Sequence, residues 1–386
     1  MRGSRIGSIW GIPVLVDISL LLALPVVGWW IQRGVSVRVW IDVLTEISPH
    51  TVRYSAIDVG LTPWLVGAVV FFGFLASLLV HDLVQTWLAR RYGVETRYIM
   101  LWVFGSLSQF DYSTKYFERE APIALAGLLT SALLTGLFTA VLWAIPGDPQ
   151  VVVVSVGLLA MFNGVVWLAN LFPIFPFDGA LLLRSLLCRV TSTMQATRIV
   201  SVLGQVLAVV IIFYAAFVLD HLLFGLVAVF FFFSAMDERQ FVRNRLFLAD
   251  TSVSEFVRRR EPCVPSKTLV DDFLAEERLD LSDERAFPVC DGDGAPVGVL
   301  TTDALRSWTD RTGVSATTNV GKLVSEDVAS IPEGETALTA YLLFRDGTKY
   351  VLVSYPDDIG VLTASEFLHM LDVRQQIAAV NLRNLP

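Results

Sequence analysis

Charged residues are scarce in this chain. Only 17% of its 386 residues are charged, whereas 54% are hydrophobic, and the mean hydropathy is +0.60. A soluble protein of this length cannot bury that much apolar surface, so lipid must cover part of it. The composition therefore excludes an ordinary soluble globular protein and predicts an integral membrane protein.

Basic residues are also few, with 29 Lys and Arg against 37 Asp and Glu, and they form no basic stripe. Because nucleic-acid binding requires cations that replace phosphate counterions, this balance excludes nucleic acid as a partner. Residues 1–236 carry 13 basic and 12 acidic residues, whereas residues 237–386 carry 16 and 25. An apolar, nearly neutral part is thus followed by an acidic, soluble part.

Six apolar stretches approach the length of about 20 residues that a membrane-spanning helix needs. If the N-terminus is cytoplasmic, most Lys and Arg residues of the membrane part lie on the inner side, as the positive-inside rule expects. We therefore expect a cell-membrane protein with both termini in the cytoplasm. The six expected spans are residues 11–31, 62–84, 121–145, 151–174, 198–218 and 221–236.

Only three cysteines are present, and this topology places all of them on or near the reducing side of the membrane. No disulfide framework is expected there. The three cysteines are Cys188, Cys263 and Cys290.

The soluble part contains an internal repeat of about 60 residues, a period that indicates stacked, similar units. Each copy has an apolar strand, a second strand with a Gly-hydrophobic-hydrophobic-Thr sequence at 298–301 or 360–363, and then a helix. This pattern resembles a tandem cystathionine-β-synthase-type (CBS) pair. The expected division is a membrane core at 1–236, a linker at 237–250, and CBS repeats at 251–310 and 316–375.

In CBS pairs an acidic residue three positions after the repeated Thr or Ser holds the ribose of an adenine nucleotide. The first repeat has Ala304 at this position, whereas the second has Glu366 after Thr363. The resemblance therefore implies a nucleotide site at Thr363 and Glu366, and a homodimer formed through the CBS module. The alternative is that Thr301 and Thr363 only cap the helices that follow.

Two polar clusters interrupt the apolar spans. His81, Asp82 and Gln85 lie near the inner end of the second span, and the sequence from Asn170 to Asp178 closes the fourth with two prolines. Both spans run inward, so we expect His81 and Asp178 to meet at a similar depth. An imidazole and a carboxylate, backed by a second acid, can hold a metal ion and activate a water molecule.

These clusters resemble the signatures of site-2 proteases, which are membrane-embedded zinc metalloproteases. The family motifs are H-E-x-x-H and N-x-x-P-x-x-P-x-D-G, and the second is complete from Asn170 to Gly179. The resemblance implies that His81 and Asp178 bind zinc and that the residue at position 82 is the general base. It gives Asn170 a role in orienting the substrate or the oxyanion.

The first motif departs from the family at two positions. Asp82 replaces the general-base Glu and is one methylene shorter, and Gln85 replaces the second ligand His with an amide, a weak ligand for zinc. We therefore expect impaired proteolysis of transmembrane segments, with zinc weakly held or absent. The alternatives are an inactive pseudoprotease that binds transmembrane clients, and a transporter or channel regulated by CBS domains.

Between the second and third spans, residues 94–110 alternate as strands do, and we expect a β-hairpin that turns at Gly105 and Ser106. In the family this hairpin captures an unwound transmembrane substrate by strand addition. The expected fold class is thus a polytopic α-helical membrane protein with about six transmembrane helices and a small β-hairpin, followed by a soluble α/β tandem CBS module. A plain polar pair at a helix end, and an N-cap at Asp178, are the non-catalytic interpretations.

Overall fold

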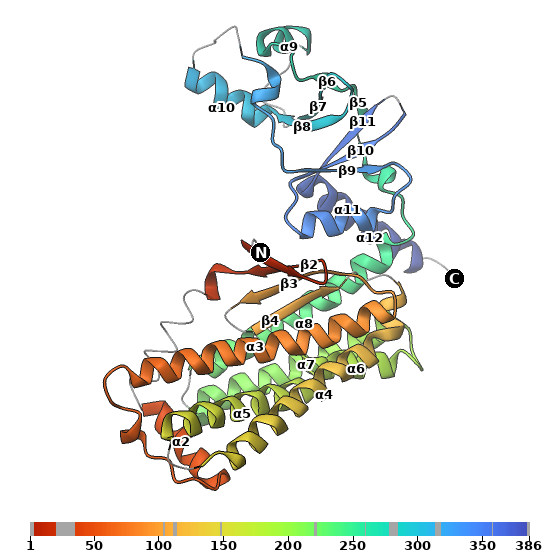
Figure 1. The fold of residues 1–386 in the computed structure, drawn as a ribbon. Helices are drawn as coiled ribbons and strands as arrows, with labels where there is room; N and C mark the ends of the chain where they lie inside the picture. Colours follow the sequence, from red (N-terminus) through yellow and green to blue (C-terminus); the bar gives the residue numbers. More distant parts are fainter. Residues whose placement is uncertain are drawn as a thin grey trace. The chain divides into compact units, whose positions relative to one another are not determined.

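A computed structural model describes residues 4–20, 35–102, 105–110, 114–146, 149–219, 222–258, 260–277, 285–312, 318–356 and 358–383. The chain divides between residues 240 and 241 into two compact units, each described separately below. Figure 1 shows the elements of both units.

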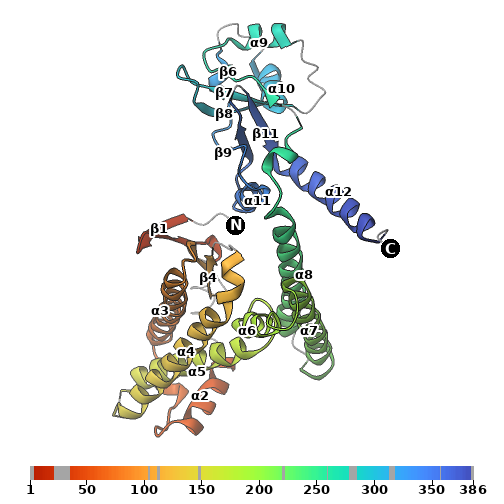
Figure 2. The ribbon, with the colours of Figure 1, turned by 90° about the vertical axis from the view of Figure 1, so that its right-hand side faces the viewer.

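The N-terminal unit is a helical assembly with a small sheet at one end (Figure 1). Helix α6 is short and lies between the group of α3, α4 and α5 and the pair of α7 and α8, as Figure 2 shows. The helices are α2 (Val35–Ile47), α3 (Thr62–Arg91), α4 (Thr114–Ala144), α5 (Gln150–Leu171), α6 (Asp178–Leu187), α7 (Thr193–Tyr214) and α8 (Leu222–Leu248), with a 3-10 turn at Tyr54–Ala56 and a π-helical turn at Ala215–Leu219.

Four helices are long and apolar enough to cross a membrane within the described ranges, namely those at Thr62–Arg91, Arg119–Ala144, Gln150–Leu171 and Thr193–Phe217. They coincide with four of the six expected spans. Most of the span expected at 11–31 lies outside the described residues. The one expected at 221–236 falls in α8, which begins at Leu222. The number of six spans therefore stays a prediction.

The start of the first expected span is wrong. Residues Ile12–Val16 form strand β2, which pairs with β1 (Ser4–Ile9) through a tight turn at Trp10 and Gly11, both with positive φ. Ile12 and Val14 are buried, so apolar residues alternate as on a half-buried strand. The prediction was wrong because a summed hydropathy does not distinguish alternating apolar residues of a strand from the apolar residues of a helix.

The expected strand pair exists, but the turn predicted at Gly105 and Ser106 is wrong, because both residues belong to strand β4. Strand β3 (Thr96–Trp102) pairs antiparallel with β4 (Gly105–Phe110), and Gly105 already pairs with Trp102. Gly105 and Ser106 are therefore paired residues of β4 rather than the turn, and residues 103–104 lie outside the described residues. The sheet order is β1-β2-β3-β4, with β2 parallel to β3, so β4 is an outer strand.

The C-terminal unit contains the two predicted repeats. Its strands pair as two sheets of order β5-β11-β10-β9 and β6-β7-β8. Each sheet holds one antiparallel pair of repeat strands, β7 with β8 and β10 with β11, followed by a helix. The elements are β5 (Arg260–Glu261), β6 (Val264–Pro265), α9 (Val270–Glu277), β7 (Ala286–Cys290), β8 (Pro296–Thr301), α10 (Thr302–Thr312), β9 (Val328–Pro332), α11 (Ala337–Arg345), β10 (Tyr350–Ser354), β11 (Ile359–Thr363) and α12 (Ala364–Arg383), with 3-10 turns at Val253–Phe256 and Val320–Lys322.

This arrangement of repeated strand pairs and helices has the pattern expected for a tandem CBS module. Each repeat has its own apolar core, with Phe287 and Leu300 in the first and Val351 and Leu362 in the second. The linker was expected at 237–250, but helix α8 extends through Leu248, so most of these residues are helical.

The structure joins Cys263 to Cys290 by a disulfide, contrary to the expectation that no cysteines pair. Their Cα atoms lie 5.8 Å apart because parallel pairing of β6 with β7 places Val264 beside Val289. The number of cysteines and the predicted cytoplasmic location do not show that β6 and β7 are adjacent, so they could not predict this disulfide. The disulfide closes a loop across 27 positions of the first repeat.

Cys263→Ser should lower the free energy of unfolding of the CBS module by about 3 kcal/mol, because the open loop regains chain entropy in the unfolded state. Thermal unfolding of the purified protein, with and without a phosphine reductant, measures this effect. The reductant should lower the melting temperature of the native chain and of the control Cys188→Ser, but not that of Cys263→Ser. Three alkylatable thiols in the unfolded, unreduced native chain would contradict the prediction.

Candidate active site

Helix α3 carries a polar face inside an otherwise apolar span. Its buried polar residues recur at spacings of three to four positions, which places them along one side of the helix. Ser77 accepts a hydrogen bond from Asn163 of α5 at 3.2 Å, which ties these helices together. In an apolar environment such groups need partners, because an unsatisfied one costs free energy. The buried polar residues of α3 are Ser77, His81, Asp82, Gln85 and Thr86.

Asp178 lies close to the polar face of α3 because the chain turns sharply between α5 and α6. A Cβ atom at Gly179 would lie 2.6 Å from the carbonyl oxygens of Leu171 and Phe172, so the close approach of α6 to the end of α5 requires glycine. The Asn170 side-chain oxygen accepts a hydrogen bond from the Asp178 backbone N–H at 3.4 Å. Asn170 thus contacts the backbone of Asp178 and fixes the start of α6.

The structure brings together His81 and Asp178, which are 97 positions apart. The Nε2 atom of His81 lies 3.3 Å from Oδ2 of Asp178. Gln85 donates from Nε2 to the other carboxylate oxygen of Asp178 at 2.9 Å. All three side chains are buried, as is Asp82 beside them on α3. Four of the predicted site residues therefore form one buried polar cluster between α3 and α6.

Helix α4 adds two residues that sequence reasoning did not assign to the site. The Ser131 hydroxyl lies 2.8 Å from Nδ1 of His81, and Ser131 is 2% exposed. A Cβ atom on Gly127 would lie among the ends of His81, Gln85 and Asp178. In the sequence, only their spacing of four positions indicated that Gly127 and Ser131 share one face of α4.

The donor set fits zinc in part. Two ligands of a tetrahedral zinc ion, each about 2.0–2.1 Å from the metal, lie about 3.3 Å apart, which matches the separation of His81 Nε2 and Asp178 Oδ2. Gln85 turns its NH₂ group toward Asp178, and an amide nitrogen that carries two hydrogens is no ligand. Among the described residues no three His, Cys, Asp or Glu side chains form a metal-binding group. His81 and Asp178 thus fit, and Gln85 does not.

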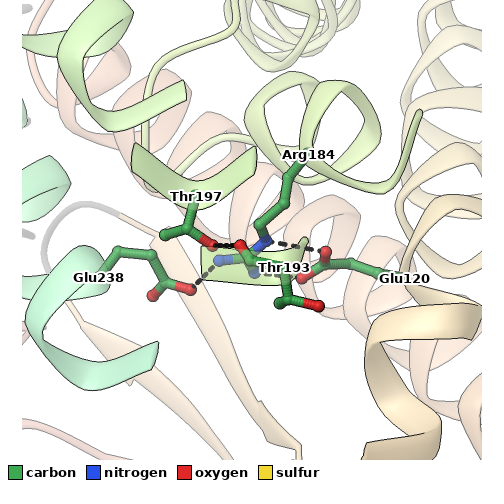
Figure 3. A network of polar contacts seen from close by, with 5 residues as sticks. All are labelled: Glu120, Arg184, Thr193, Thr197 and Glu238. Carbon is green, nitrogen blue, oxygen red and sulfur yellow. Dashed lines mark hydrogen bonds and ion pairs between the residues drawn. The ribbon is translucent and has the colours of Figure 1, made fainter. Parts of the chain in front are cut away.

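A buried ion network holds α6, and with it Asp178, in place. Figure 3 shows Arg184 of α6 between Glu120 of α4 and Glu238 of α8. The guanidinium donates to both carboxylate oxygens of Glu120 and, at 2.6 Å, to Glu238. Arg184 and Glu120 are almost fully buried. Such forked, charge-assisted hydrogen bonds constrain the positions of both partners. Arg184 therefore connects α6 to α4 and α8 near Asp178.

No family model matches the chain. It is 30% identical over 330 residues to the Mycobacterium tuberculosis protein described as "Putative zinc metalloprotease Rip3", which covers 80% of this chain and 82% of that protein. The solved site-2 protease of Methanocaldococcus jannaschii is 26% identical, with a TM-score of 0.41, and covers 62% of this chain and 95% of that one. A CBS-domain structure from Sphaerobacter thermophilus is 14% identical, with a TM-score of 0.27, and covers 35% and 96%.

The chain is an integral membrane protein with a buried polar cluster between its helices and a C-terminal unit of two strand-and-helix repeats. Because the match to the mycobacterial protein extends over 330 residues, it reaches beyond the N-terminal unit, Arg2–Gln240, into the C-terminal one. The chain belongs to the site-2 protease family of zinc metalloproteases.

The CBS module contains a separate cavity of about 630 Å³. Its wall includes Thr363 and Glu366, the predicted nucleotide-binding residues, together with Arg285 and Lys349. Burial raises the pKa of the Tyr350 phenol, another wall residue, and the Asp303 carboxylate adds to the rise. Tyr350 therefore stays a neutral hydroxyl donor at physiological pH.

Both repeated threonines also cap helices, as the alternative interpretation expected. Thr301 accepts from the backbone N–H of Ala304 at 3.2 Å, and Thr363 accepts from that of Glu366 at 3.3 Å. The Thr363 hydroxyl also donates to the Glu366 carboxylate at 2.9 Å. Capping does not exclude ligand binding, because Thr363 and Glu366 remain part of the cavity wall.

Arg184→Gln should lower the free energy of unfolding by about 3–5 kcal/mol, because Glu120 then stays buried without its guanidinium partner. Thermal unfolding of the detergent-solubilised protein measures this loss. Arg189→Gln, at an exposed position just beyond α6, is the matched control and should change little. An unchanged melting temperature for Arg184→Gln would show that the network does not anchor α6.

Proposed function

We propose that this protein is an intramembrane metalloprotease of weakened activity, which holds zinc through His81 and Asp178 and acts on transmembrane segments of other proteins. The observation that carries the proposal is the 3.3 Å separation of His81 Nε2 and Asp178 Oδ2 in a buried pocket. When bound, zinc would supply a Lewis acid and an activated water molecule. In this proposal Asp82 accepts a proton at the general-base position.

The departures at positions 82 and 85 are the reason to expect weak activity. A carboxylate displaced by about 1 Å can cost on the order of 100-fold in rate, and Asp82 is one methylene shorter than Glu. Gln85 contributes an N–H donor to Asp178 rather than a lone pair to a metal ion. We therefore expect slow cleavage and substoichiometric zinc.

The same hydrogen bond favours a second candidate function. Because Gln85 already binds one oxygen of Asp178, the pocket has internal partners without a metal ion. A chain of this kind could bind transmembrane clients without cutting them, as a pseudoprotease that regulates their fate. In both proposals the outer strand β4 receives an unwound client segment by strand addition, near the backbone of Gly105 and Ser106.

The proposal also includes the membrane topology and the role of the CBS module. Both termini face the cytoplasm, so the CBS module is cytoplasmic, and residues 237–250 join it to the membrane core. The module binds an adenine nucleotide in its cavity and forms a homodimer. A transporter or channel function is the less favoured candidate, because Ser77, His81 and Gln85 of α3 pair with neighbouring helices.

The combined change Asp82→Glu and Gln85→His should restore zinc to near one equivalent and raise cleavage of a transmembrane substrate by at least about 100-fold. Metal analysis of the purified protein and gel-based cleavage in detergent or liposomes measure the two quantities. Asp178→Ala should abolish both in either background, because it removes a ligand.

Each outcome of this experiment discriminates between the candidates. Robust cutting by the native chain contradicts the expected impairment. Restored zinc and cutting, with capture but no cleavage of the substrate by the native chain, supports the pseudoprotease. A restored chain that binds no zinc shows that the pocket is not a metal site.

Glu366→Ala should remove the preference of the CBS module for ribonucleotides. A hydrogen bond to a charged carboxylate contributes about 1.5–3 kcal/mol, so the native chain should bind AMP at least about tenfold more tightly than 2′,3′-dideoxy-AMP. Calorimetric titration of the full-length protein with both nucleotides measures the ratio. Asp372→Ala, on the same helix but outside the cavity wall, is the control. Equal affinities for the two nucleotides in the native chain would contradict ribose recognition by Glu366.

A further inference from the structure

Helix α4 forms one wall of the pocket through two small residues. Gly127 and Ser131 are four positions apart and therefore share a helix face. Ser131 contacts His81 of α3, and Gly127 faces the ends of His81, Gln85 and Asp178, although neither residue belongs to the H-E-x-x-H or N-x-x-P-x-x-P-x-D-G motif. Their contribution follows from two separate observations.

The first observation is the direction of the Ser131 hydroxyl. Hydroxyl groups in helices commonly donate to the carbonyl four residues earlier, and Thr130, Thr135 and Thr139 of α4 do so at 2.7–2.8 Å. Ser131 instead lies 2.8 Å from Nδ1 of His81 on the neighbouring helix. This contact between helices sets the orientation of the imidazole ring.

A hydroxyl group suits His81 because it can donate or accept. When Nε2 of His81 carries its proton toward Asp178, Nδ1 is a lone pair that accepts from Ser131. When Nε2 offers its lone pair to a cation, Nδ1–H donates to the same hydroxyl oxygen. Ser131 therefore satisfies the inner ring nitrogen of His81 in both protonation patterns, which a carbonyl acceptor or an N–H donor could not do.

The second observation is the space beside Gly127. A Cβ atom built there would lie 2.1 Å from Nε2 of Gln85 and 2.7 Å from both Oδ2 of Asp178 and Nε2 of His81. These distances are too short for real contacts, so a methyl group there would displace the ends of these three side chains. The bare backbone of Gly127 thus permits three polar groups from two other helices to converge.

We propose that Gly127 and Ser131 are positioning residues of this metal site: Ser131 directs Nε2 of His81 toward the ion, and Gly127 keeps the space between the ligands open. This inference rests on the proposed binding of zinc by His81 and Asp178. Partners of metal-bound imidazoles typically change metal affinity by about 10–100-fold when they are removed.

The test measures zinc affinity, by competition with a chromophoric chelator, in the full-length chain and in the Asp82→Glu/Gln85→His background. Ser131→Ala should weaken zinc binding by about 10–100-fold, whereas Ser131→Thr, which keeps a hydroxyl, should stay near the parent value. Gly127→Ala should weaken zinc binding by at least about 10-fold, because the added methyl group displaces the ends of His81 and Asp178. Thr130→Ala and Gly136→Ala are matched controls on α4, because the Thr130 hydroxyl bonds its own helix and Gly136 has open space around it.

A second readout does not depend on zinc. The ¹⁵N shifts of His81 in the metal-free chain, assigned by comparison with His81→Asn, report which ring nitrogen carries the proton. Ser131→Ala should change this tautomer balance, and Ser131→Thr should restore it.

The outcomes separate the positioning role from the proposed function. If the restored chain binds zinc and Ser131→Ala or Gly127→Ala weakens binding no more than the controls, the positioning role is wrong and the zinc site stands. If the restored chain binds no zinc, the proposed zinc site is wrong, and with it the role of Gly127. Unchanged ¹⁵N shifts of His81 in Ser131→Ala would then overturn the role of Ser131 as well.

Discussion

Burial of polar side chains among apolar helices is the constraint on which the rest of the N-terminal unit depends. A hydroxyl, amide or carboxylate in such surroundings costs several kcal/mol unless it finds a partner. Three buried polar residues of helix α3 meet this requirement, each with a different neighbour: Ser77 with Asn163 of α5, His81 with Ser131 of α4, and Gln85 with Asp178 of α6. These pairings fix the register of four helices, so the same contacts that stabilise the helix assembly also form the pocket.

Close backbone approach is the second requirement, and it explains why two glycines matter here. Gly179 lets the start of α6 approach the end of α5, which positions Asp178, and Gly127 lets α4 approach the ends of three polar side chains. Behind the pocket, Arg184 joins α6 to α4 and α8 through two carboxylates. The pocket is therefore held from both ends of the ten-residue helix α6.

Sequence alone predicted the parts of the structure that depend on local pattern. Four membrane helices, the β3–β4 hairpin and the four principal CBS strands follow from hydropathy, alternation and repetition. It missed strands β1 and β2, whose apolar residues resemble the start of a span, and the pairing of Cys263 with Cys290, which depends on strand adjacency. Ser131 was also missed, because a serine in an apolar helix looks the same whether it bonds its own backbone or another helix.

The amide at position 85 changes what the pocket needs in order to be stable. A histidine at this position would present a lone pair or a proton beside His81 and Asp178, and a bound cation would best satisfy all three. Gln85 instead supplies an N–H donor to Asp178 at 2.9 Å, and Ser131 occupies the inner nitrogen of His81. Each of these groups thus has a partner within the protein. Because metal is no longer required to satisfy buried groups, the fold can persist when metal affinity falls, so a single substitution can separate the stability of this pocket from its chemistry.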